Sequence, residues 1–262
     1  MGRTRDTLLR RMPHVHAHLS GDDLRKQNDA LRDHHAGMAS WGIRERRFRL
    51  WFSGIENGAS VLEIGCGSGV FATELLHLGY QRLTLADVDD YRTFSEAKAL
   101  PFLRWDANRE PLALPDASID VIISLQVFEH LENVWHAMRE CARVIRNGGR
   151  LIVSMPYGDS FLSRLRFVWT GDVIGYSGTN DHIAFLPKSV ATKLWQSCGF
   201  MLMQTDWSEP FVKMGRWKWR WPRQTFLCRL ASRKVCYVFQ KQSRSDVSAP
   251  AWKTFSHTTP TV

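Results

Sequence analysis

Short apolar runs alternate with segments of helical periodicity from residue 60 onward. Continuous apolar runs bounded by turn residues predict buried strands, and apolar positions three and four apart predict amphipathic helices. The expected strands are 60–65, 82–87, 102–106, 118–125, 147–155, 200–207 and 234–242. The expected helices are 41–52, 69–79, 90–99, 134–145 and 187–199.

This alternation predicts the fold class. Strands that are apolar on both faces must be covered on both sides, which is typical of a parallel sheet wrapped by helices. We therefore expect an α/β protein with a doubly wound, mostly parallel sheet. In such a sheet a ligand binds at the carboxyl ends of the strands, where the strand order reverses.

Composition divides the chain into a main domain and its additions. Residues 1–40 are polar and rich in histidine and arginine, so we expect an N-terminal arm or loose helices there. The main domain is expected over 41–241. It includes a long, glycine- and aromatic-rich connection at 157–186 that is long enough to act as a lid. A tryptophan- and basic-rich insertion is expected at 208–234, and the Ser/Thr/Pro-rich residues 242–262 predict a disordered tail.

The positive charge is local. The formal net charge is +9, from 35 basic and 26 acidic residues. No acidic residue lies between Glu209 and Asp246, whereas ten basic residues do. A partner attracted by this charge would therefore bind at the insertion.

The cysteines and the apolar runs bear on the cell compartment. The five cysteines include no C-x-x-C spacing, so we expect free thiols in a reducing compartment rather than disulfides or a zinc site. No apolar run has the length of a membrane-spanning helix, and none near residue 1 suits a signal peptide. We expect a cytoplasmic protein, with peripheral contact to a membrane as a further expectation.

The first strand leads into the glycine-rich stretch "EIGCGSGVF". Glycines at 65, 67 and 69 allow the backbone to approach a ligand closely, and the next helix offers free N–H groups there. A plain tight turn is the alternative, because a glycine triad alone is a weak signal.

The spacing of the glycines and the nearby carboxylates limit which ligands this loop could bind. A dinucleotide fingerprint is G-x-G-x-x-G, and Val70 stands where its third glycine would be, which disfavours a nicotinamide dehydrogenase. Glu63 would repel a pyrophosphate and would suit an ammonium group. Asp87 ends the second strand, where a carboxylate can accept hydrogen bonds from ribose hydroxyls. A ligand with both a ribose and a cation, such as S-adenosylmethionine, fits these residues.

At this point the chain resembles the class I S-adenosylmethionine-dependent methyltransferases, in their small-molecule, methyltransferase type 11-like branch. The matches occur in family order over roughly 58–207. They are "EIGCGSG" at 63–69, "LTLAD" at 83–87, "WDA" at 105–107, "SIDVIIS" at 118–124, "FEHL" at 128–131 and "RVIRNGGRLIVSMP" at 143–156. The resemblance implies a seven-stranded, Rossmann-like sheet whose last strand, at 234–241, is antiparallel.

The resemblance also implies S-adenosyl-L-methionine as cofactor and assigns its contacts. The glycine loop with Cys66 would line the methionine part, and Glu63 would lie near its ammonium group. Asp87 would hold the ribose and Val88 would pack on the adenine. Asp106 would accept from the adenine amino group, unless it caps a turn instead, and Ala107 would donate through its backbone. The residues expected to bind the cofactor are Glu63, Gly65, Cys66, Gly67, Gly69, Asp87, Val88, Asp106, Ala107, Ser124, Leu125 and Gln126, the last three beside the methyl group.

Two histidines are candidate general bases for a hydroxyl acceptor. His130 follows the fourth strand, and His182 lies in the lid-like connection. In the related quinone-biosynthesis O-methyltransferases an additional glutamate joins the Glu-His pair to hold a divalent metal. Gln126 occupies that position here, so we predict no metal.

The acceptor is the least constrained part of the prediction. No Pro-Pro-aromatic, Pro-Cys or double-Glu loop follows the fourth strand, which disfavours base and arginine methylation. The arrangement "SFLSRLRFVWTG…DHIAFLP" after the fifth strand resembles methyltransferases of bacterial glycan- and lipid-modifying pathways. This resemblance favours O-methylation of a small-molecule or lipid-linked acceptor, with a glycan among the candidates. Trp217, Trp219 and Trp221 alternate with basic residues, which fits membrane contact, base stacking or simple core packing. The alternative function is a membrane- or nucleic-acid-binding module on the same fold with little turnover.

Overall fold

A computed structural model describes residues 48–178, 180–208, 211–214, 217–220 and 226–243. The predicted arm at 1–40 lies outside these residues, as does the predicted tail apart from its first two positions. For the strands at 211–214 and 217–220, and for 227–229, only the backbone is described.

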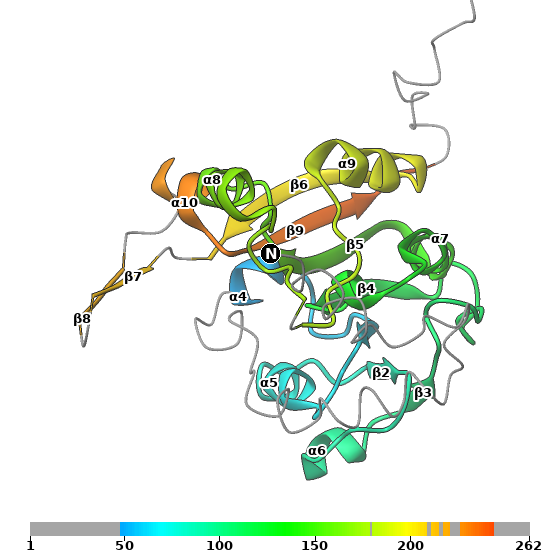
Figure 1. Cartoon of the computed structure of the whole chain (residues 1–262). Helices are drawn as coiled ribbons and strands as arrows, with labels where there is room; N and C mark the ends of the chain where they lie inside the picture. Colours follow the sequence, from blue (N-terminus) through cyan, green and yellow to red (C-terminus); the bar gives the residue numbers. More distant parts are fainter. Residues whose placement is uncertain (1–47, 179, 209–210, 215–216, 221–225, 244–262) are drawn as a thin grey trace, which may run out of the picture. The chain divides into compact units, whose positions relative to one another are not determined.

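Seven strands form one sheet in the order β3-β2-β1-β4-β5-β9-β6 (Figure 1). All neighbouring pairs from β3 to β5 are parallel, and β9 runs antiparallel to both β5 and β6. This confirms the predicted doubly wound, mostly parallel sheet with an antiparallel last strand. The strands are β1 (Val61–Ile64), β2 (Leu83–Asp87), β3 (Phe102–Arg104), β4 (Ile119–Leu125), β5 (Ile145–Pro156), β6 (Phe200–Trp207) and β9 (Lys234–Lys241).

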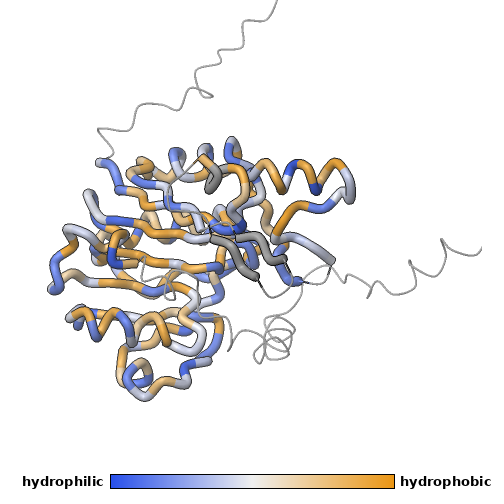
Figure 2. Tube along the Cα trace, turned by 90° about the vertical axis from the view of Figure 1, so that its left-hand side faces the viewer, coloured by the Kyte–Doolittle hydropathy of each residue, from blue (hydrophilic) through white to orange (hydrophobic). Residues whose placement is uncertain are grey.

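Helices cover both faces of the sheet and bury two apolar clusters. One cluster joins the sheet to α7 (Val134–Val144) and α9 (Lys188–Ser197). The other joins it to α4 (Phe48–Trp51), α5 (Val70–His77) and α6 (Ser95–Lys98). Successive strand residues point to opposite clusters, because side chains alternate across a strand. Figure 2 shows hydrophobic residues concentrated along these strands.

The helix predicted over 90–99 is shorter in the structure, where only Ser95–Lys98 is helical. The reason is a local hydrogen-bond network that competes with the helix. The Asp90 carboxylate accepts from the backbone N–H and the guanidinium of Arg92. Arg92 also donates to the carbonyl oxygens of Ala97 and Leu100 at 2.9 and 2.8 Å. The segment before Ser95 is therefore held as a loop.

Several described elements had no predicted counterpart. The connection at 157–186 contains the helix α8 (Phe161–Thr170), and a short 3-10 helix, η1 (Phe128–His130), follows β4. The predicted insertion contains a two-stranded antiparallel hairpin, β7 (Phe211–Met214) and β8 (Trp217–Arg220), followed by α10 (Phe226–Ala231). The tryptophan side chains of this insertion lie outside the described part of the chain. Among the described residues, no helix has the length and apolarity needed to cross a bilayer.

A buried polar contact ties the first described helix to the far edge of the sheet. Trp51 Nε1 donates to Asp206 Oδ2 at 3.0 Å, and both side chains are buried. A buried carboxylate is costly unless hydrogen bonds satisfy it. This contact therefore fixes α4 against β6, the last strand in the order.

We predict that Trp51→Phe lowers the free energy of unfolding by about 1–3 kcal/mol, because the phenyl ring keeps most of the packing but cannot donate to Asp206. Urea unfolding followed by circular dichroism measures this change. The half-exposed Trp135 provides a matched control, since Trp135→Phe removes an indole N–H at the surface. Equal unfolding midpoints for the two variants would rule out a stabilising role for the contact.

Candidate functional site

The strand order places one edge of the sheet at a topological switch point. The order runs outward from β1 to β2 on one side and from β1 to β4 on the other, and the crevice between such strands is where ligands bind. Ile64, at the end of β1, pairs with Ala86 of β2 and Ser124 of β4. The residues that follow these strands therefore lie side by side, which brings the glycine loop, Asp87 and Gln126 to the same edge.

Two glycines of the loop are required by the packing of the protein itself. Gly65 has φ +71°, and a Cβ there would lie 2.2 Å from a methyl carbon of Val127. Gly69 has φ +83°, and a Cβ there would lie 2.3 Å from the Cβ of Ala97. Gly67, between them, also has a positive φ but meets nothing within 4 Å. Of the three, Gly67 is the one that borders open space.

Asp87 holds the loop in place. Its Oδ2 accepts from the Gly67 N–H at 2.9 Å, and its Oδ1 accepts from the Val88 N–H at 2.8 Å. Burial raises the pKa of Asp87 to about 6, although these two hydrogen bonds act to lower it. The carboxylate is thus fixed at the end of β2, and its remaining lone pairs are available for further donors.

Glu63 is a buried carboxyl group beside which the described residues place no positive charge. It is 5% exposed, and its Oε2 has no hydrogen-bond partner among the described residues. Burial raises the pKa of Glu63 well above its usual value, and the negative charge of Asp87 raises it further. A cation bound in the crevice would offset both effects. Burial also raises the pKa of the neighbouring Cys66 thiol, so Cys66 is a packing residue rather than a thiolate nucleophile.

The residues expected near an adenine follow β2 and β3. Val88 is half-buried, and Ala107 is buried. Asp106 is half-buried, and its Oδ1 accepts from the backbone N–H of Asn108 at 3.0 Å. This bond is the turn-capping contact that was the alternative for Asp106. It uses one oxygen of the carboxylate.

The end of β4 is strained. Gln126 has φ +59°, a left-handed conformation that non-glycine residues seldom adopt and that is common at functional sites. Its backbone N–H donates to Ser154 O at 2.9 Å, which holds the conformation. Ser124 is fully buried, and its Oγ has no partner among the described residues. Leu125 is half-buried between them.

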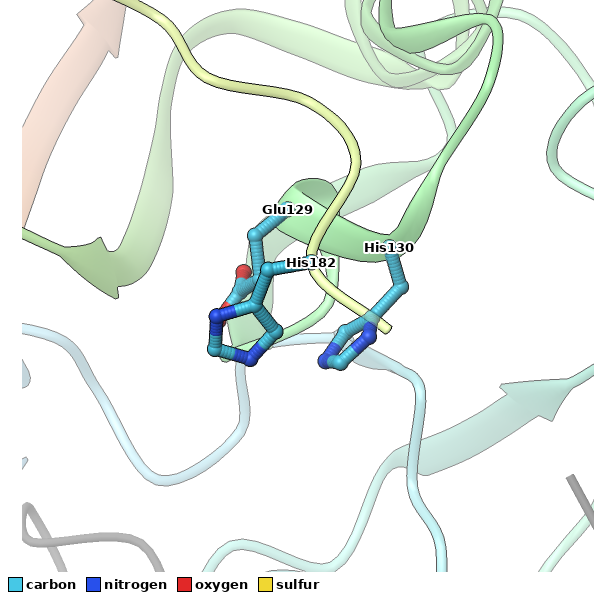
Figure 3. Close-up of side chains that lie close together, drawn as sticks. All are labelled: Glu129, His130 and His182. Atoms are coloured by element: carbon cyan, nitrogen blue, oxygen red, sulfur yellow. The ribbon is translucent and has the colours of Figure 1, made fainter. Parts of the chain in front are cut away.

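The lid-like connection returns to the site and brings the two candidate histidines together. The backbone N–H groups of Ile183 and Ala184 donate to the carbonyl oxygen of Glu129 at 2.8 and 2.9 Å. The imidazole rings of His130 and His182 consequently pack edge to face, with centroids 4.7 Å apart. Figure 3 shows the two rings side by side, with the Glu129 carboxylate beside His182.

Each imidazole is oriented by an oxygen acceptor at Nδ1. His130 Nδ1 lies 3.0 Å from Asp181 Oδ2, and His182 Nδ1 hydrogen-bonds to Gly175 O. Burial lowers the pKa of His130, but the hydrogen bond to Asp181 and the charges of Glu129 and Asp181 outweigh it, so that the pKa is raised. Burial and the neighbouring His130 lower the pKa of His182. The pair is therefore asymmetric, and His130 is the more basic partner.

Glu129 is the third member of this cluster. It is 1% exposed, and neither carboxylate oxygen has a hydrogen-bond partner among the described residues. Burial raises its pKa to about 7, opposed by the charge of His130. Ligand atoms of Glu129, His130 and His182 lie within 4.8 Å of one another, and imidazole with carboxylate is a donor set that transition metals accept. The "FEHL" motif alone did not reveal this grouping, because His182 is remote in sequence.

One functional candidate was not identified from the sequence. Asp181 directly precedes His182. An acidic residue next to a candidate base is the sequence signal that could have identified it. Its role became visible only when the structure placed its carboxylate against His130, on a different element.

Comparisons with known proteins agree with the fold and with the methyltransferase motifs. The methyltransferase-domain family model Methyltransf_11 matches residues 62–153. A probable S-adenosylmethionine-dependent methyltransferase of Mycobacterium tuberculosis is 39% identical over 97 residues, which cover 37% of this chain and 35% of that protein. The 27-O-demethylrifamycin SV methyltransferase of Amycolatopsis mediterranei is 33% identical over 140 residues, 44% of this chain and 48% of that protein.

A third relative, the malonyl-[acyl-carrier protein] O-methyltransferase of Methylococcus capsulatus, is 31% identical over 157 residues, 56% of this chain and 54% of that protein. The chain thus spans about a third to a half of the length of these curated relatives.

Solved structures support the fold. A Haloferax volcanii methyltransferase in complex with the Trm112 activator has a TM-score of 0.61 at 17% identity, over 84% of this chain and 97% of that one. A S-adenosylmethionine-dependent methyltransferase from Archaeoglobus fulgidus has a TM-score of 0.53, also at 17% identity, over 76% of this chain and 92% of that one. Residues 62–153 thus match a methyltransferase domain, and the sheet order, the ordered motifs and these relatives make the chain similar to class I S-adenosylmethionine-dependent methyltransferases.

Proposed function

We propose that this protein is an S-adenosylmethionine-dependent methyltransferase that acts on oxygen of a small-molecule or lipid-linked acceptor. The observation that carries the proposal is the pair of carboxylates at the switch point. Asp87 is fixed by the loop backbone, and the buried Glu63 has no counter-charge in the part of the chain that the structure describes. A ligand with a ribose and an ammonium group satisfies both.

The residues around the crevice suit this cofactor. Glu63 would face the ammonium group beside Gly67, the glycine that borders open space. Asp87 would accept from the ribose hydroxyls, and Asp106 and Ala107 would contact the adenine. Ser124, Leu125 and the strained Gln126 would lie beside the methyl group. When bound, the cofactor supplies an activated methyl group on a sulfonium, so the protein has to orient the acceptor and exclude water.

His130 is proposed as the general base. The cofactor would supply the methyl group, and Nε2 of His130 would accept the proton that the acceptor hydroxyl loses. Asp181 accepts from Nδ1–H and so fixes the tautomer that leaves Nε2 as the acceptor nitrogen. His182 packs on the ring of His130 and is the second candidate base. The relatives named as O-methyltransferases favour oxygen as the methylated atom.

Peripheral membrane contact of a cytoplasmic protein belongs to the same proposal. The alternation of Trp217, Trp219 and Trp221 with basic residues supports contact with anionic lipid. The second candidate function is a membrane- or nucleic-acid-binding module with little turnover, favoured by the ten basic residues between Glu209 and Asp246. A nucleic-acid binder would weaken steeply with rising salt, which separates it from the enzyme.

Titration calorimetry with S-adenosylhomocysteine tests the proposal. We expect saturable binding, and we expect Asp87→Asn to weaken it roughly 10- to 100-fold, because a hydrogen bond to a charged group contributes about 1.5–3 kcal/mol. Glu56→Gln, at an exposed carboxylate remote from the crevice, is the matched control. Labelled methyl transfer to lipid and aqueous cell fractions then identifies the acceptor class. No binding at millimolar ligand, or equal binding by both variants, would refute the cofactor assignment.

Glu63→Gln tests the uncompensated carboxyl group. Since the folded pKa of Glu63 is raised, its favourable contribution exists at low pH and is lost as pH rises through that pKa. The variant should therefore melt a few degrees above the wild type at pH 8 without ligand, and at the same temperature at pH 4. It should also gain less than the wild type from saturating S-adenosylhomocysteine. Thermal scans with and without ligand measure both effects, and an unchanged ligand-induced shift would show that Glu63 does not face the cofactor.

Asp181→Asn tests the orientation of the base. Losing the aspartate charge lowers the pKa of His130, so the acidic limb of the pH–rate profile should move to lower pH. The maximal rate should fall about 10- to 100-fold, as expected for one charged hydrogen bond, and His130→Ala should cost roughly 100-fold or more. A merely structural role for Asp181 would lower the rate without moving the limb.

The metal alternative needs its own control, because Glu129, His130 and His182 could also coordinate an ion. The prediction of no metal requires that activity survive dialysis against EDTA and that elemental analysis find no stoichiometric transition metal. Loss of activity that zinc or manganese restores would instead assign the three side chains as ligands.

A further inference from the structure

The helix α8 presents its apolar side to solvent. Only Ser163 of its ten residues is buried. The Ser163 N–H donates to Ser160 Oγ at 3.1 Å, and Ser163 Oγ accepts from the backbone N–H of Ile174 at 2.9 Å. Polar contacts therefore fix the inward side of this helix, whereas surface helices normally turn an apolar stripe inward.

The outward side of α8 is apolar. At about 100° per residue, Phe161, Leu165 and Val168 fall within a sector of roughly 60°, with Ser163 on the opposite side. Val168 and Trp169 are 80% and 81% exposed. The exposed apolar side chains of α8 are Phe161, Leu162, Leu165, Phe167, Val168 and Trp169. Such a concentration on one short helix marks an interaction surface.

The charged residues of α8 itself are positive. Arg164 and Arg166 are exposed on α8, which has no acidic residue. Arg166 is paired with Asp172 at 3.5 Å, just beyond the end of the helix. The helix α10 packs beside α8, and its first residue, Phe226, is 72% exposed (Figure 1). The sequence around α10 is basic and lacks acids from 210 to 245. Apolar side chains flanked by arginines are typical of helices that lie in the interface of an anionic bilayer.

The same connection also carries a residue of the candidate site. Ser163 of α8 is hydrogen-bonded to Ile174, and the adjoining Gly175 accepts from His182. His182 in turn packs on His130. A bilayer that holds α8 would therefore lie against the segment that closes over the acceptor position.

We propose that α8 is an interfacial docking helix that inserts Phe161, Leu165, Val168 and Trp169 into the boundary of an anionic lipid bilayer. Docking would present the site to an acceptor held in that bilayer. This last step rests on the proposed function, whereas the binding to lipid does not. The occupant is a lipid surface because the apolar stripe is flanked by arginine and neighbours a basic segment.

Vesicle sedimentation with the full chain tests this inference. The probes are phosphatidylcholine vesicles with and without one-third phosphatidylglycerol. We expect the wild type to bind the anionic vesicles, and Val168→Ser/Trp169→Ser to bind them roughly tenfold or more weakly, because two side chains no longer enter the apolar layer. Arg164→Gln should lose about fivefold on anionic vesicles and little on neutral ones.

The controls separate docking from folding and from methyl transfer. Met201→Ser removes an exposed apolar side chain on the edge strand β6 and should bind like the wild type. S-adenosylhomocysteine affinity should be unchanged in Val168→Ser/Trp169→Ser, which would show an intact fold. Equal vesicle binding by this variant and the wild type would overturn the proposal. So would a dimer in light scattering that the variant abolishes, since the face would then contact a second copy. Vesicle binding without methyl transfer would leave docking intact and remove the proposed function.

Discussion

The parallel pairing of β1 with β2 on one side and β4 on the other is the constraint on which the rest of the site depends. A one-residue slip in either ladder would turn every side chain of the strand to the opposite face. The observed register keeps Leu62 and Ile64 in one apolar cluster and Val61 in the other. The same register sets the ends of three strands at one edge. The glycine loop, Asp87 and Gln126 meet there because the buried residues of their strands allow no other alignment.

The carboxylates at this edge of the sheet, those of Asp87, Glu63 and Glu129, are stabilised in different ways. Asp87 is stabilised by two backbone N–H groups and therefore serves the loop as well as a ligand. Glu63 and Glu129 are more deeply buried and have carboxylate oxygens without partners among the described residues. Burying such groups costs stability, so their presence favours a cation at each: under the proposed function, an ammonium group beside Glu63 and, beside Glu129, the imidazolium that His130 becomes when it accepts a proton. The two halves of this edge would thereby divide cofactor binding from proton transfer.

The connection after β5 has three structural roles. Its end supplies Asp181 and His182 to the site, its backbone anchors to Glu129, and its helix α8 exposes an apolar face. In a parallel sheet, a connection that follows a strand begins at the carboxyl edge, which is where ligands bind in this fold. The hydrogen bonds that anchor this connection to Glu129 would then control both the entry of an acceptor and closure over it. An acceptor held at the surface that α8 contacts would therefore be favoured.

The sequence by itself determined the doubly wound fold class and the positions of the glycine loop and of the carboxylate that ends the second strand, because periodicity and spacing are local properties of the chain. It also indicated His130 and His182 as separate candidates. Only the tertiary structure decided that these two rings touch, that Asp181 orients one of them, and that Gly65 and Gly69 are needed for packing against Val127 and Ala97. It also decided that the apolar residues of α8 point outward. Each of these features depends either on contacts between residues remote in sequence or on which side of a helix is buried. The spacing of apolar positions along the chain predicts neither.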